Sequence, residues 1–342
     1  MSKEELKQDY FRLIDFPEDA RGIPDDLLRV YMSVWNYPGN PDKQSIEIDK
    51  AINKQYSLFD FNRLIWDTIP EIETLLAKKY PDVINNVFAG ENPDPIANAN
   101  IIRCQNGFLI LFNSGFLFKI YTATIIICRS LFYDKEIFKG IDNNEQAPSI
   151  TNELAIKSFL ELVKDESKID EELFEEKSEY KTMVIFELIF SCVRFVLAHE
   201  YGHVHSFYYP DEYKEKVENM VKYLINYKSL NEFTARRWTE ELKAEGFALD
   251  YVMQRVLSMR DDLDSSNYFD INAPVYLFAL ENLLEKIKPG MCIPLELSSY
   301  PDFKFRLEGI RYGKKADTTF ALADYLVKHI KMLEELILNT KN

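Results

Sequence analysis

The sequence predicts an α+β protein that is mainly α-helical, and three observations support this fold class. From about residue 181 onward, apolar residues recur at helical spacing over most of the chain. A stretch rich in Ile, Phe and Thr, residues 101–132, is the best candidate for a small sheet or hairpin. Hydrophobic residues make up 46% of the 342 residues, which is enough for a sizeable core.

The order of these patterns divides the chain into three parts. Residues 1–140 are expected to form an N-terminal helical and β region that contributes the sheet, with helices at Pro24–Asn36 and Ile69–Tyr80. Residues 141–180 are acidic and begin with loop signals, which is typical of a linker or a lid, and they contain one helix at Asn152–Asp165. Residues 181–342 are expected to form a helical region that ends in the amphipathic stretch Phe320–Leu338.

Residues 101–132 allow two interpretations. One is a β-hairpin that turns at Asn113–Gly115, and the other is a strand followed by a buried helix after Gly115. Periodicity does not separate the two for short apolar runs, and the second interpretation is favoured.

The charge and the absence of targeting signals exclude several classes of protein. The formal net charge of −15 argues against binding to nucleic-acid phosphates and against an anionic membrane surface. The N-terminal residues are charged and lack the apolar core of a secretory signal. The four cysteines are scattered without a CxxC pair, so they are expected to be reduced. We therefore expect a soluble, cytoplasmic protein.

The stretch "FVLAHEYGHVHSFYYP" carries three of the four histidines within an apolar run that predicts a buried central helix. His199 and His203 are four residues apart, which places both imidazoles on one helix face, where they can bind one zinc ion. Glu200 lies beside them and can take a proton from a water at that ion. Burying these groups unpaired would cost several kcal/mol, and a metal removes that cost. His205 points elsewhere and is expected to be solvated or hydrogen-bonded.

The third ligand is expected from a downstream helix, Phe233–Leu257, which Ser229 and Glu232 are predicted to open as a capping box. Glu241 is the preferred ligand, and Glu240 replaces it if the helix phase differs by one residue. Glu245 shares a face with Glu241 and is expected to accept the outer N–H of a zinc-bound histidine.

Two glycines in these helices bear on their packing. Gly202 and Gly246 carry no side chain, so they would allow the two helices to approach each other closely.

These residues resemble the gluzincin class of zinc metallopeptidases, in which HExxH is followed by a helix bearing E-x-x-A-D. Here "HEYGH" is followed by "ELKAE", Glu241–Glu245, with Glu245 in place of the aspartate. The resemblance implies a zincin-like core: an HExxH helix, a downstream ligand-bearing helix and a small sheet. It also implies a Zn²⁺ cofactor and Glu200 as the general base of peptide hydrolysis.

A second match lies downstream. "SSYPDFKFR" resembles the T-H-P-P-x-x-x-R pattern of some gluzincins, with Tyr300, Pro301 and Arg306 at the positions of His, Pro and Arg. Tyr300 would donate a hydrogen bond to a developing oxyanion, and Arg306 would lie beside the ligands. The alternative is that both residues hold a loop to the core. The soluble context looks more like the phage-exclusion peptidases of bacteria than like membrane members of the class.

The resemblance also implies an extended peptide or protein substrate beside an edge strand. Gly107–Tyr121 is the candidate for that strand, although plain core sheet is the favoured interpretation of this stretch. The function predicted from the sequence is therefore zinc-dependent peptide hydrolysis. The first alternative is a zinc-stabilised binding or regulatory protein without turnover. The second is a helical interaction protein whose histidines bind no metal.

Overall fold

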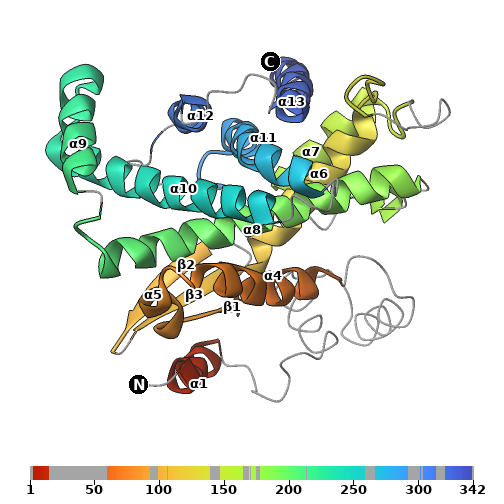
Figure 1. The fold of residues 1–342 in the computed structure, drawn as a ribbon. Helices are drawn as coiled ribbons and strands as arrows, with labels where there is room; N and C mark the ends of the chain where they lie inside the picture. The colour runs from red at the N-terminus through yellow and green to blue at the C-terminus, as the bar shows by residue number, and fades with distance from the viewer. Residues whose placement is uncertain are drawn as a thin grey trace.

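The computed structural model describes residues 3–14, 60–92, 99–105, 107–138, 147–164, 169, 171–174, 178–212, 214–258, 266–291, 301, 303–312 and 320–340. A long helix, α8 (Glu179–Tyr208), runs through the middle, with a small sheet on one side and further helices on the other (Figure 1). The other described helices are α1 (Lys3–Leu13), α4 (Asp60–Leu76), α5 (Pro81–Asn85), α6 (Ser114–Ser130), α7 (Asn152–Lys164), α9 (Lys214–Lys228), α10 (Glu232–Ser258), α11 (Ser266–Ile287), α12 (Phe303–Tyr312) and α13 (Ala321–Thr340).

Helix α8 occupies the centre because its sequence is apolar on almost every side. Its N-terminus is capped by the side chain of Ser178, which accepts a hydrogen bond from the backbone N–H of Lys181. The helix is long and apolar enough to cross a membrane, yet 67% of its most apolar window is buried inside the protein. That burial is typical of a core helix, and the prediction of a central buried helix is confirmed.

The sheet has three strands, β1 (Val87–Asn92), β2 (Ala99–Cys104) and β3 (Gly107–Asn113). Their order is β1-β3-β2, with β1 parallel and β2 antiparallel to β3. Strand β3 is buried along its whole length and leads directly into α6. The strand-then-helix interpretation of residues 101–132 is therefore confirmed, and the hairpin is formed by β2 and β3 instead of turning at Asn113–Gly115.

The favoured interpretation of Gly107–Tyr121 as core sheet is confirmed for its strand part, Gly107–Asn113, and the edge-strand candidate is wrong. Strand β3 is the central strand because β1 and β2 pair with its two sides, and the residues after Asn113 are helical. Among the described strands β2 lies at an edge of the sheet, and its residues Asn100, Ile102 and Arg103 are exposed. Helix α8 contacts both β2 and β3, so the sheet edge lies beside the central helix.

One hydrophobic cluster connects most of the described elements. It takes Ile65 from α4, Phe159 from α7, Leu197 from α8 and Ile337 from α13. A smaller cluster covers the sheet on the α1 side, with Leu6, Tyr10, Phe11, Phe88, Leu109 and Leu111. The division of the chain at residues 140 and 180 stays a prediction, although α7 buries one face in the large cluster.

Several helix predictions are confirmed within the described residues, namely those that correspond to α7, α10 and α13. The predicted Ser229 capping box is wrong. Ser229 has a left-handed backbone with φ of 54°, and α10 begins three residues later, where the Asn231 side chain accepts the backbone N–H of Thr234. The helix expected at Pro24–Asn36 lies outside the described residues.

Candidate metal centre

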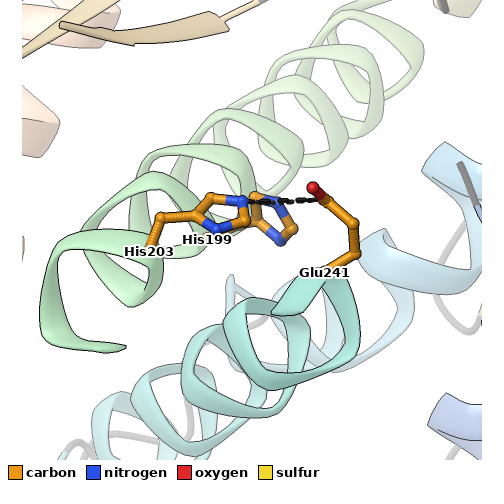
Figure 2. Close-up of side chains that lie close together, drawn as sticks. All are labelled: His199, His203 and Glu241. Atoms are coloured by element: carbon orange, nitrogen blue, oxygen red, sulfur yellow. Dashed lines mark hydrogen bonds and ion pairs between the residues drawn. The ribbon is translucent and has the colours of Figure 1, made fainter. Parts of the chain in front are cut away.

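His199 and His203 on α8 and Glu241 on α10 converge on one point (Figure 2). The two imidazole Nε2 atoms are 3.0 Å apart, and Glu241 Oε2 lies 3.4 Å from His199 Nε2 and 3.6 Å from His203 Nε2. The four-residue spacing of the histidines places their rings on one helix face, and α10 crosses that face with Glu241. Glu240 lies on the exposed side of α10 beside Lys243, so the helix phase selects Glu241.

The separations fit a tetrahedral metal ion. Ligand bonds of about 2.0–2.1 Å in tetrahedral geometry place two ligand atoms roughly 3.3 Å apart, close to all three observed separations. Glu241 Oε2 is buried and makes no hydrogen bond to the described residues. Two imidazole nitrogens and a carboxylate oxygen in contact without a shared cation would leave lone pairs facing one another. These residues therefore fit a zinc ion with three protein ligands, which leaves the fourth position open.

The protonation states of His199 and Glu241 also favour a cation. Burial lowers the pKa of His199 to about 4, so its imidazole is neutral at physiological pH. Burial raises the pKa of Glu241, but the approach of the two imidazoles outweighs this effect and holds it well below its usual value. Burial disfavours protonation of His203, and the nearby Glu241 carboxylate overcomes it and raises the pKa. A neutral imidazole and an ionised carboxylate are the forms that bind a metal.

Glu200 lies next to His199 on α8 and is almost fully buried. Burial raises the pKa of its carboxyl to about 7, with His203, Glu241 and Arg306 within electrostatic range. A carboxyl group whose pKa lies near neutrality can both accept and return a proton, which suits a general base.

The close contact of the two ligand helices depends on Gly202, which lies between the two histidines. A Cβ at this position would lie 2.9 Å from Ala244 Cα and 3.0 Å from Ala244 O. Gly246 does not share this role, because a Cβ there would meet no atom within 4 Å among the described residues. Only one of the two predicted close approaches is therefore present.

Glu245 and Arg306 lie next to the three candidate ligands, but Glu245 does not have the partner that the sequence predicted. Arg306 Nε on α12 donates a short hydrogen bond to Glu245 Oε1, so Glu245 binds arginine instead of a histidine N–H. Helix α12 places the Arg306 guanidinium beside α10, so the guanidinium pairs with the buried Glu245 carboxylate. His199 Nδ1 is buried and has no hydrogen-bond partner among the described residues.

The sequence analysis missed two residues that lie beside Arg306, Glu281 and Phe278 on α11. Arg306 Nη1 lies 3.8 Å from Glu281 Oε2, and the guanidinium carbon lies 3.9 Å from the centre of the Phe278 ring. Burial raises the pKa of Glu281 to about 7. No sequence signal marks these residues, since a phenylalanine and a glutamate three apart are ordinary in a helix.

The remaining site predictions concern His205 and Tyr300. His205 turns away from the ligands, and its Nε2 lies 2.8 Å from Glu212 Oε2, which confirms the expected hydrogen-bonding role. Tyr300, the expected oxyanion donor, lies outside the described residues.

Comparison of the chain with family models, curated proteins and solved structures finds no match. The functional argument therefore depends on the site itself.

Proposed function

We propose that the protein is a zinc-dependent metallopeptidase of the gluzincin type and acts on protein or peptide substrates in the cytoplasm. The observation that carries the proposal is the convergence of His199 Nε2, His203 Nε2 and Glu241 Oε2 at tetrahedral separations, with a buried Glu200 beside them. A purely structural zinc site has no need of a neighbouring general base, and such a site is usually closed by a fourth protein ligand.

In the proposed reaction His199, His203 and Glu241 hold the ion, which supplies Lewis acidity for activating water and polarising a peptide carbonyl. Glu200 takes the proton of the attacking water and later delivers it to the leaving amine. Burial of Glu200 keeps bulk water from competing for that proton and holds its pKa near neutrality. Arg306 and Glu245 fix α10 behind Glu241 through their ion pair.

Strand β2 supports a peptide as the substrate. Within the described residues its strand partner is β3, so β2 lies at an edge of the described sheet, which is where an extended chain adds in strand addition. Helix α8 contacts β2, so a peptide added to this edge would run beside the helix that carries the histidines.

The test compares zinc content and peptide cleavage in the wild type, Glu200→Gln and His203→Ala. The probe is a peptide mixture made from a denatured cell proteome, and mass spectrometry reads the new termini. Glu200→Gln should keep one zinc ion and lose turnover by about 100-fold or more, because proton transfer typically contributes that much. His203→Ala should lose both zinc and turnover.

The matched control is Glu240→Gln, since Glu240 is an exposed neighbour on α10 that pairs with Lys243. This variant should cleave like the wild type. Full activity of Glu200→Gln would rule out the mechanism, and bound zinc without any cleavage would favour a non-catalytic zinc protein.

A further inference from the structure

Exposure to solvent increases along one face of α8, away from the ligands. His199, His203 and Phe207 follow one another at four-residue intervals, so they lie in one stripe. The side chains of His199 and His203 are 9% and 23% exposed, and Phe207 is 46% exposed. The site therefore opens toward the C-terminal end of α8.

A similar stripe leads out of the site along α10. Arg237 precedes the ligand Glu241 by four residues, and Phe233 precedes Arg237 by four, so the three share one helix face. Phe233 is 69% exposed. Helices α8 and α10 run in opposite directions, so the N-terminal part of α10 and the C-terminal part of α8 leave the metal centre on the same side (Figure 1).

An arginine lies over the exposed phenylalanine of each stripe. The guanidinium of Arg103, on the edge strand β2, lies 4.6 Å from the centre of the Phe207 ring. The guanidinium of Arg237 lies 5.9 Å from the centre of the Phe233 ring. This contact holds the planar guanidinium in place and leaves its N–H groups available for a carboxylate.

Neither arginine has a carboxylate partner among the described residues, although acidic residues outnumber basic ones by 56 to 41 in the chain. Two acids that face this region are engaged elsewhere. Glu240 accepts a hydrogen bond from Lys243 Nζ at 3.1 Å, and Asp82 accepts one from Tyr209 Oη at 3.1 Å. The open side of the metal centre is therefore flanked by two positive charges in a strongly acidic protein.

We propose that Arg103 and Arg237 select substrates that carry acidic side chains close to the cleaved bond. The inference rests on the proposed peptidase function and names the substrate class. Four residues of helix advance about 6 Å, and an extended peptide covers that length with about two residues. Because an arginine side chain extends the reach further, Asp or Glu is favoured two to four residues from the scissile bond.

The test profiles cleavage sites in the same proteome-derived peptide mixture with Arg103→Glu, Arg237→Glu and the double variant. The wild type should cleave at sites enriched in Asp and Glu at the stated positions. Each charge reversal should reduce that enrichment by about threefold or more, in line with an exposed charge pair. The double variant should prefer Lys or Arg at the same positions.

Lys157→Glu on α7 makes the same change in net charge at a distant exposed position and should leave the profile unchanged. Wild-type cleavage with no acidic preference, or an unchanged profile in the double variant, overturns the inference and leaves the peptidase proposal in place. Absence of cleavage by the zinc-loaded wild type overturns both.

Discussion

At the scale of single residues, the buried acids of this protein differ in the partners that their carboxylates have. Glu241 faces two imidazoles and Glu245 pairs with Arg306. Glu91 on β1 is 1% exposed, and neither of its carboxylate oxygens has a hydrogen-bond partner among the described residues. Burial raises its pKa to about 8. A group of this kind takes up a proton on folding and affects stability rather than catalysis.

We predict that Glu91→Gln stabilises the protein at pH 8 and has little effect at pH 5. The folded pKa of about 8 lies above the ordinary value of 4.5, so the folded state retains a proton that the unfolded state releases. As far as Glu91 is concerned, the folded state therefore keeps its full stability below about pH 4.5, where Glu91 is protonated in both states, and loses stability as the pH rises toward 8. Urea unfolding at pH 5, 6, 7 and 8 measures the effect, and a constant difference between variant and wild type would contradict it.

At the scale of elements, the candidate metal centre depends on how closely α8 and α10 pack. Gly202 provides the contact by leaving room for the Ala244 backbone. The sequence predicted that His199 and His203 share one helix face, because helical spacing determines which side chains do so. It also gave Glu241 as the preferred third member of the group, with Glu240 as the alternative, and the roles of these residues and of Glu200 stay predictions. It did not predict the partner of Glu245, since Arg306 reaches it from α12, 61 residues away along the chain.

We predict that Gly202→Ala lowers the free energy of unfolding by about 1–3 kcal/mol, because the added methyl group pushes against the α10 backbone. Its zinc affinity should fall several-fold as the ligands separate. Gly246→Ala is the matched control, since its methyl group meets open space and removes a helix glycine. Thermal unfolding and zinc titration measure both variants. Equal stability and equal zinc affinity of the two variants would show that the close contact at Gly202 supports neither the fold nor zinc binding.

At the scale of the whole molecule, a ring of alternating charges connects four helices. Arg194 on α8 and Arg255 on α10 each contact both Glu71 on α4 and Asp270 on α11. Ser191 adds a hydrogen bond to Asp270 at 2.7 Å. The helical fold class was predictable from periodicity, but this ring was not, because its members are separated by up to 199 residues and appear in sequence as ordinary charges. The order of the strands was equally unpredictable, since local pattern does not say which strand is central.

We predict that Asp270→Ala lowers the free energy of unfolding by about 3–5 kcal/mol, because it leaves the buried Arg255 and the partly buried Arg194 with Glu71 as their one shared acid among the described residues. Glu218→Ala, which removes the exposed partner of Arg236, should leave stability almost unchanged. Chemical denaturation of the two variants beside the wild type gives the comparison. A small loss in Asp270→Ala would mean that the ring contributes little to holding the helices together.

The central claim is that His199, His203 and Glu241 bind one divalent ion between α8 and α10. The most direct measurement is the zinc stoichiometry of the purified 342-residue chain, in the wild type, His203→Ala and Glu241→Ala, after dialysis against zinc and removal of excess metal. We predict one zinc ion per wild-type chain and none in either variant, with Glu240→Ala, the exposed neighbour, still binding one. A wild-type chain without zinc, or full occupancy in Glu241→Ala, would contradict the account.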